Sequence, residues 1–208
     1  MTGEVAPRRA LFFGDSLVAG VGDPGGGGWV ARIVDACFAR GVPLTPYNLG
    51  VRRETSIQVA ARWRSEARPR IPQGADARIV ISFGANDTTS EHGTLRAVVE
   101  DSRKALAGML DEASAIGLPQ FVVGPAPVDD REQNRRIEAL TEVFAAVCDQ
   151  RSVPFADVCE PLNECPVWMS EVAAHDGAHP GSEGYGKLAQ VLIERGLLAW
   201  LTEPAASR

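Results

Sequence analysis

Short apolar runs alternate with amphipathic segments along nearly the whole chain, and this alternation constrains the fold more than any other feature. Each run has the length of a strand and ends at glycine, proline or polar residues. The segments between the runs repeat apolar side chains at helical spacing. Strands that alternate with helices form parallel β-α-β units with right-handed crossovers. We therefore predict a three-layer α/β/α sandwich around a five-stranded parallel sheet, with strands over residues 10–13, 44–49, 78–83, 121–123 and 153–158.

Helices are predicted where apolar residues recur three or four positions apart. Pro-containing residues 159–174 are expected to form an irregular loop, in which one helical turn is an option. Glycine-rich residues 18–28 lack the Gly-Lys-Ser/Thr ending of a phosphate-binding loop, so a flexible rim loop is expected there. We find no linker or repeat and therefore predict one domain over residues 1–208, with a core from about residue 9 to residue 201. The expected helices cover residues 29–40, 57–68, 95–113, 185–201 and a segment that begins after Asp129 or Asp130 and ends near Cys148.

Charge and hydropathy exclude several classes of partner. The 208 residues carry 27 acidic and 21 basic side chains, a formal net charge of −6, which argues against nucleic acid or an anionic membrane surface as the main partner. No run approaches the roughly 20 apolar residues that span a bilayer. Residues 1–9 are polar and do not resemble a signal peptide. We expect a cytoplasmic protein without integral membrane association, and the sequence does not indicate its oligomeric state.

The four cysteines do not form a metal or redox motif, because none belongs to a C-x-x-C pair. Cys37 and Cys148 lie on the apolar sides of predicted helices and are expected to be core residues. Cys159 and Cys165 are six residues apart in the Pro-containing segment. They would form a disulfide only in an oxidising compartment, which no other feature of the sequence indicates.

Polar and glycine-containing turns follow the predicted strands, and these turns contain candidates for chemistry. Ser16 follows the first strand, Gly50 the second and Asn86 the third. The carboxyl ends of parallel strands share one edge of a sheet, where ligands bind in open α/β folds. The loop after the last strand leads to Asp176 and His179 at the same edge. Each of these residues alone is typical of turns and caps, but together they lie where an acyl-transfer site requires them.

Serine is a weak nucleophile at neutral pH and needs a base within hydrogen-bonding reach. His179 is the candidate base for Ser16, and Asp176, three residues earlier, is the candidate acid that orients the imidazole. His175 is a rival base, but it directly precedes Asp176 and is expected to point elsewhere, whereas His92 lies in a polar loop and is expected to be solvated. The candidate oxyanion donors are the backbone N–H groups of Ser16 and Gly50 and the side-chain amide of Asn86.

The chain resembles the SGNH hydrolases, also called the GDSL family of esterases and lipases. Four blocks carry the resemblance, and they span most of the chain in the family's order: Gly14-Asp15-Ser16-Leu17, Asn48-Leu49-Gly50, Gly84-Ala85-Asn86-Asp87 and Asp176-Gly177-Ala178-His179-Pro180. The resemblance implies a flavodoxin-like sandwich and a nucleophilic serine outside the Gly-x-Ser-x-Gly elbow. It also implies catalysis without a metal or cofactor, through an acyl-enzyme on Ser16 that water activated by His179 hydrolyses.

The second block departs from many members of the family, because Arg52-Arg53-Glu54 stands where small residues often follow the glycine. The two arginines could favour an acidic or phosphate-bearing substrate, or they could form a solvated, paired surface. We expect pocket walls from loops 18–28, 88–93, 124–130 and 159–174, with Asp15, Arg52, Trp168 and Met169 as pocket residues.

The absence of a long apolar lid favours small, soluble esters with short to medium acyl chains. The alternatives are a carbohydrate O-acetyl esterase, a thioesterase or an acyltransferase that uses the same residues. A flavodoxin-like binding module with a structural serine is a more distant alternative.

Overall fold

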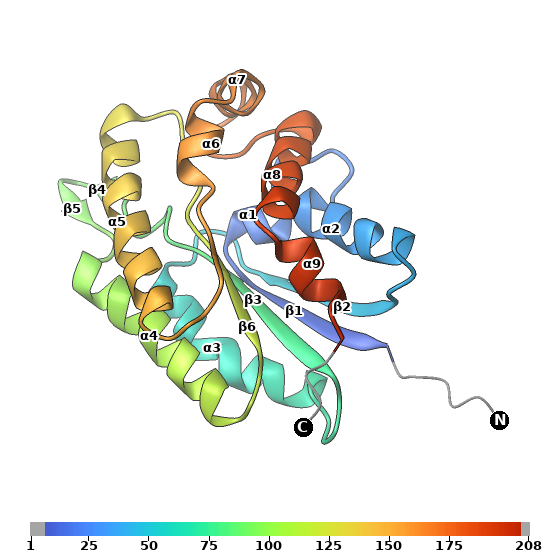
Figure 1. The fold of residues 1–208 in the computed structure, drawn as a ribbon. Helices are drawn as coiled ribbons and strands as arrows, with labels where there is room; N and C mark the ends of the chain where they lie inside the picture. Colours follow the sequence, from blue (N-terminus) through green and yellow to red (C-terminus); the bar gives the residue numbers. More distant parts are fainter. Residues whose placement is uncertain (1–6, 205–208) are drawn as a thin grey trace.

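The computed structural model describes residues 7–204 and contains the five-stranded parallel sheet that the sequence predicts (Figure 1). The polar segments expected at residues 1–6 and 205–208 lie outside the described residues. The strands are ordered β2-β1-β3-β6-β7, and every neighbouring pair is parallel. Their bounds are β1 (Arg8–Gly14), β2 (Leu44–Gly50), β3 (Ala77–Ser82), β6 (Gln120–Val123) and β7 (Phe155–Ala156).

Helices cover both faces of the sheet (Figure 1), because β1 alternates apolar side chains between two cores. Phe12 packs edge-on against Trp29 with ring centroids 5.7 Å apart, and Phe13 packs edge-on against Trp63 on the opposite face at 6.4 Å. Burial of side chains of this size contributes roughly 2–3 kcal/mol each. The first face is covered by α2 (Gly28–Ala39), α8 (Ser182–Glu194) and α9 (Leu197–Thr202), and the second by α3 (Ser56–Ala67), α4 (Val99–Ala115) and α5 (Arg131–Asp149).

The strand order places a topological switch point between β1 and β3. From β1 the chain runs through α2 to β2 at the edge of the sheet, and it then returns through α3 on the other face to β3. The loops that leave β1 and β3 therefore separate toward opposite faces and open a crevice at their carboxyl ends. Ser16 and Asn86 lie in these two loops.

Three segments differ from the sequence predictions. Residues 159–174 form two helices, α6 (Cys159–Asn163) and α7 (Pro166–Ala174), because Pro166 occupies the first turn of a helix, where it is tolerated. The predicted helix over residues 185–201 is divided into α8 and α9, since Gly196 has a φ of 92°. The predicted helix over residues 95–113 begins only at Val99.

The residues just before α4 form a small antiparallel hairpin instead, β4 (Ser90–Glu91) and β5 (Thr94–Leu95). His92 and Gly93 connect the two strands with φ values of 53° and 80°, the backbone that a tight two-residue hairpin turn requires. The short elements that remain are α1 (Ser16–Ala19) and the 3₁₀-helix η1 (Arg68–Arg70).

The glycine-rich segment after α1 is held by one buried carboxylate. Asp23 accepts hydrogen bonds from the N–H groups of Gly25 and Gly28 at 3.2 and 3.0 Å and from the Ser182 hydroxyl at 2.6 Å. It also pairs with Arg32 at 2.7 Å, and these contacts hold its pKa well below 3.8. The contacts of Asp23 thus fix this glycine-rich segment as a turn and link it to Arg32 on α2 and to Ser182 on α8.

All four cysteines are free thiols, and Cys37 and Cys148 are buried in the core as predicted. Cys159 is buried at the start of α6, and Cys165 directly precedes α7. No disulfide joins these two cysteines. Among residues 7–204, no helix combines the length and the apolar character that crossing a membrane requires.

Candidate active site

Ser16 occupies the first position of α1, immediately after the end of β1. Asp15 caps this helix by accepting a hydrogen bond from the Leu17 N–H at 3.0 Å. The turn is tight because Gly14 lies directly against β3. A Cβ atom at Gly14 would stand 2.0 Å from the Ser82 carbonyl oxygen. The sequence Gly-Asp-Ser therefore brings Ser16 to the crevice between β1 and β3, with its backbone N–H among the unpaired donors of a helix N-terminus.

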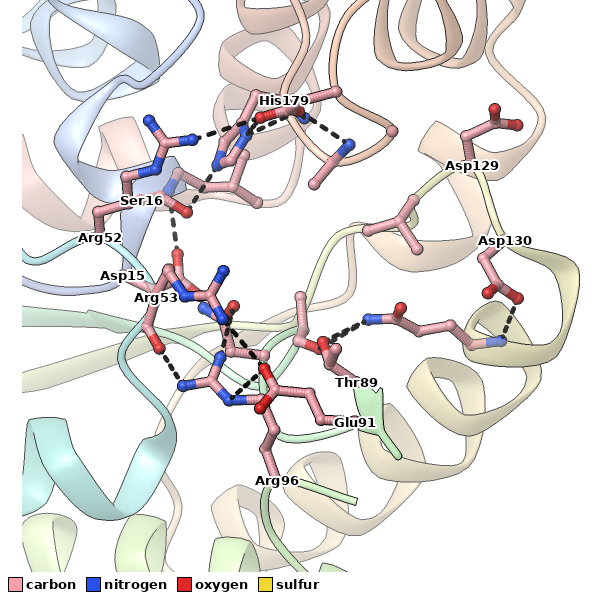
Figure 2. A pocket seen from close by; sticks show the side chains of 18 residues that line it. Asp15, Ser16, Arg52, Arg53, Thr89, Glu91, Arg96, Asp129, Asp130 and His179 are labelled. Carbon is pink, nitrogen blue, oxygen red and sulfur yellow. Dashed lines mark hydrogen bonds and ion pairs between the residues drawn. The ribbon is translucent and has the colours of Figure 1, made fainter. Parts of the chain in front are cut away.

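Ser16, His179 and Asp176 form a continuous hydrogen-bonded row (Figure 2). The Ser16 Oγ lies 2.7 Å from His179 Nε2, and His179 Nδ1 lies 2.8 and 2.9 Å from the two carboxylate oxygens of Asp176. Because a carboxylate only accepts hydrogen bonds, it places the ring proton on Nδ1. Nε2 is then free to accept the Ser16 hydroxyl proton. This arrangement can convert the serine into a nucleophile.

Asp176 accepts hydrogen bonds from the backbone of its own turn as well as from the His179 ring. Its Oδ1 accepts hydrogen bonds from the N–H groups of Ala178 and His179 at 3.2 and 3.0 Å. Partial burial raises the pKa of Asp176, but the bonds from the His179 ring and from these two N–H groups outweigh it, so the pKa lies below its ordinary value of 3.8. His175 is exposed, and no hydrogen bond or ion pair joins its side chain to this row within the described part of the chain.

Asn86 projects into the same site from the loop after β3. Its Nδ2 donates to the Glu54 carbonyl oxygen at 3.0 Å and to Asp15 Oδ2 at 3.2 Å. Asp15 is 3% exposed, and burial raises its pKa to about 7, with a contribution from the charge of Asp87, against the hydrogen bonds from Leu17 and Asn86 that lower it. Asp87 anchors the starts of α3 and α4 by accepting hydrogen bonds from Ser56 and Ser102.

Gly50 is the last residue of β2 and packs against the backbone of Asp15 and Ala19. Its N–H donates to Asn48 Oδ1 at 3.1 Å, and Gly50 is not among the residues that line the cavity. The reason for glycine here is close packing of two backbones. A Cβ atom at Gly50 would stand 2.3 Å from the Ala19 nitrogen and 2.7 Å from the Asp15 carbonyl oxygen. The role of the Gly50 N–H as an oxyanion donor stays a prediction.

A cavity of about 420 Å³ opens beside Ser16 and His179, within the size range of small-molecule sites. Its apolar lining comes from Leu17, Ala85, Val128 and Ala178. Figure 2 shows Asp129 and Asp130 on the side of the cavity away from Ser16. Polar and charged side chains make up the rest of the wall, with Thr89, Gln133, Arg52, Arg53, Glu91 and Arg96 among them. In residues 7–204, no group of three or more His, Cys, Asp or Glu side chains is arranged to hold a metal ion.

Comparison with known proteins agrees with this geometry. The model of the GDSL-like lipase/acylhydrolase family matches residues 12–187. The chain belongs to this family. Esterase TesA of Pseudomonas aeruginosa is 28% identical over 158 residues, which cover 74% of each chain. The family and this relative indicate that the protein is a serine esterase or acylhydrolase that acts on small-molecule esters.

Two solved structures share the fold. A lipase/acylhydrolase from Enterococcus faecalis aligns with a TM-score of 0.75 at 24% identity, over 96% of this chain and 100% of its own. Axe2, an acetylxylan esterase from Geobacillus stearothermophilus, aligns with a TM-score of 0.75 at 17% identity over 100% of both chains. At these identities, the two structures support the α/β architecture of a GDSL-like hydrolase.

Two predicted pocket residues do not line the cavity of this GDSL-like hydrolase. Trp168 is fully buried in the core, where its Nε1 donates to the Pro127 carbonyl oxygen at 3.0 Å and its ring packs edge-on against Tyr185. Met169 is partly buried against the same core. The cavity also receives no lining residue from segments 18–28 and 159–174, because both are folded into turns and helices against the rest of the chain.

The two arginines of the second block line the cavity, and both have acidic partners. Arg52 lies 3.5 Å from Asp176 Oδ2, and Arg53 lies 3.0 Å from Glu91. Both side chains are more than half exposed, so each ion pair contributes little to stability. The pairing favours the interpretation of a paired surface over that of a phosphate-binding site.

Glu91 lies in loop 88–93, where the sequence predicts a pocket wall, but sequence reasoning missed Arg96 and Gln133 as cavity residues. A hairpin of two-residue strands gives no alternation pattern that would place Arg96. Gln133 could have been found, because it lies in the first turn of the helix that Asp130 caps, with its backbone N–H donating to Asp130 at 2.9 Å.

Proposed function

We propose that the protein hydrolyses carboxylic esters through an acyl-enzyme on Ser16. Ser16 Oγ attacks the ester carbonyl carbon and passes its proton to His179 Nε2, while Asp176 stabilises the imidazolium that forms. His179 then gives this proton to the leaving alkoxide, and the alcohol departs. A water molecule, deprotonated by His179, attacks the acyl-enzyme, and Ser16 leaves with the proton. The observation that supports this proposal is the hydrogen-bonded row from Ser16 through His179 to Asp176.

The oxyanion of each tetrahedral intermediate needs preorganised donors. We assign this role to the Ser16 N–H at the start of α1, the Gly50 N–H and the Asn86 side-chain amide. In the free enzyme, Asn86 Nδ2 already donates to Asp15 at 3.2 Å, the longer of its two bonds, and the oxyanion would take or share this proton. Removal of one such donor lowers kcat by about 10²- to 10³-fold in a well-studied hydrolase, which sets the expectation for Asn86→Ala.

The cavity supports a preference for small, soluble esters. Its volume of about 420 Å³ accommodates a short to medium acyl group with its alcohol, and its apolar lining is limited to a few side chains such as Leu17, Ala85 and Val128. A long acyl chain would place methylene groups against charged walls. We therefore expect kcat/KM to pass through a maximum at short or medium chain length and not to increase to the longest esters.

One observation favours a carbohydrate O-acetyl esterase as the second candidate. Thr89, Asp129, Asp130 and Gln133 give the cavity hydroxyl, carboxylate and amide groups, which suit the several hydroxyl groups of a sugar. The likeness in fold to an acetylxylan esterase is compatible with this candidate. Faster release of acetate from acetylated sugars than from p-nitrophenyl acetate would select it.

The test of the proposed function is hydrolysis of p-nitrophenyl acetate and butyrate by the wild type and by Ser16→Ala. The variant should retain its circular dichroism spectrum and lose several orders of magnitude of activity. Equal activity of the two proteins would show that Ser16 is not the nucleophile. An inactive wild type whose Ser16 also fails to react with a p-nitrophenyl phosphonate would favour the binding-module alternative.

A further inference from the structure

Arg96 connects two of the loops that form the candidate active site. It follows β5 of the small hairpin and is 16% exposed. Its Nη1 donates to Asn86 Oδ1 at 3.3 Å, and its Nη2 donates to the Arg53 carbonyl oxygen at 2.6 Å. Glu91, on the other strand of the hairpin, lies 3.6 Å from Arg96 Nε and 3.0 Å from the Arg53 side chain. Figure 2 shows Arg53, Glu91 and Arg96 together at one side of the cavity.

The contact with Arg96 decides which end of the Asn86 amide faces Ser16. A guanidinium group only donates hydrogen bonds, so the atom of Asn86 that meets it must be the carbonyl oxygen. The amide nitrogen then turns to the opposite side, where Asp15 Oδ2 and the Glu54 carbonyl oxygen accept from it. Asn86 therefore has acceptors on one side, Asp15 and Glu54, and the Arg96 donor on the other, so only one orientation of its amide satisfies all these hydrogen bonds. In this orientation the amide N–H groups face the start of α1, where Ser16 lies.

The second contact holds an unusual backbone. Arg53 has a φ of 69°, a left-handed conformation that residues with a side chain adopt infrequently and at an energetic cost. Its carbonyl oxygen is held by Arg96, and its side chain pairs with Glu91. The Arg53 carbonyl oxygen and Glu91 thus hold the Arg96 guanidinium in place, with its Nη1 against Asn86 Oδ1.

We propose that Arg96 is a positioning residue that holds the Asn86 amide in the orientation in which its N–H groups face the oxyanion. It acts through Asn86 and not through contact with the reacting atoms. This inference rests on the proposed acyl-enzyme function, because it assigns a role only in the stabilisation of the tetrahedral intermediates.

The test compares Arg96→Ala and Arg96→Lys with the wild type on p-nitrophenyl acetate. Arg96→Ala should lower kcat by about 10- to 100-fold and leave KM within about twofold, because the lost stabilisation exists in the transition state. Arg96→Lys should recover part of kcat, since one ammonium group can satisfy one of the two acceptors. The rate of Ser16 phosphonylation by a p-nitrophenyl phosphonate should fall in parallel with kcat/KM, because that reaction also passes through an oxyanion at this position.

Arg136→Ala is the matched control. The Arg136 Nε donates to the Thr88 carbonyl oxygen at 2.9 Å, so it supports the same loop without contact with Arg53 or Asn86. We expect wild-type kcat for this variant. If Arg96→Ala retains wild-type kcat, or if Arg136→Ala loses as much, the positioning role is refuted. A wild type without esterase activity would instead refute the proposed function on which this inference rests.

Arg96→Lys carries the test where Arg96→Ala fails to fold. One ammonium group cannot satisfy both acceptors, so kcat of the folded Arg96→Lys should lie below that of the wild type, with KM within about twofold. An unchanged kcat, or a raised KM with kcat unchanged, would contradict the positioning role.

Discussion

Asp15→Asn tests whether the buried carboxyl next to Ser16 opposes folding at neutral pH. Asp15 is 3% exposed, and no cation pairs with it in the described residues. Its hydrogen-bond donors are the Leu17 N–H at 3.0 Å and Asn86 Nδ2 at 3.2 Å. These bonds compensate only part of the cost of removing the charge from water, so the pKa rises to about 7 in the folded protein.

The magnitude follows from linkage between ionisation and folding. Between about pH 4 and about pH 7 the folded protein keeps the Asp15 proton, which the unfolded chain releases, so this group makes the free energy of unfolding fall as pH rises. A pKa that moves from 3.8 to about 7 corresponds to about 4 kcal/mol. Asparagine does not ionise and can still cap α1. The free energy of unfolding of Asp15→Asn, relative to the wild type, should therefore increase by up to about 4 kcal/mol across this range.

Urea unfolding of the two proteins at several pH values between about 4 and 7 measures this difference. Asparagine must direct its NH₂ group at one of the two donors that Asp15 accepts from, which adds a constant penalty at every pH. The pH dependence of the difference is therefore the informative quantity, and not its value at any single pH. A difference that stays constant from about pH 4 to about pH 7 would refute the argument that burial of Asp15 raises its pKa.

Two other side-chain changes have predictable effects on stability. Gly50→Ala should lower the free energy of unfolding by about 2 kcal/mol or more, because its Cβ would stand 2.3 Å from the Ala19 nitrogen, and an unchanged urea midpoint would contradict this. Asp23→Ala should destabilise the protein by about 3 kcal/mol near neutral pH by removing the partner of Arg32 and of two backbone N–H groups. Because the pKa of Asp23 is lowered on folding, its contribution is present above about pH 4 and is lost as pH falls through the lowered pKa. A difference from the wild type that persists unchanged in acid would refute the role given to Asp23.

The fold was predictable because its signals are local and repeated. The apolar run from Ala10 to Phe13 predicts a strand buried on both faces, and the structure places alternate residues of this run in two cores. The tight hairpin before α4 could not be read in the same way. Its strands have two residues each, and its turn uses His92 with a φ of 53° where sequence patterns favour asparagine, aspartate or glycine.

The part of the candidate site that lies in loops at the carboxyl ends of the strands was predictable from the order of the strands. The structure places Ser16, Asp176 and His179 within hydrogen-bonding distance, although their catalytic roles stay a prediction. The sequence predicts a pocket position for Trp168 because its segment contains two prolines and no clear helical pattern, whereas a helix carries this side chain into the core. The sequence does not reveal which way the Gly50 N–H points, and in the structure this group donates to Asn48 Oδ1.

Transfer of an acyl group to Ser16 is the step on which the proposed function depends. Mass spectrometry of the enzyme quenched in acid during turnover of p-nitrophenyl acetate, followed by peptide mapping, detects this step. We expect one acetyl group on the peptide that contains Ser16, and none on Ser16→Ala or His179→Ala treated in the same way. Turnover without an acetylated enzyme at any quench time, in rapid-quench conditions that resolve the first turnover, would contradict the proposed transfer. So would acetylation at another residue that supports turnover when Ser16 is replaced.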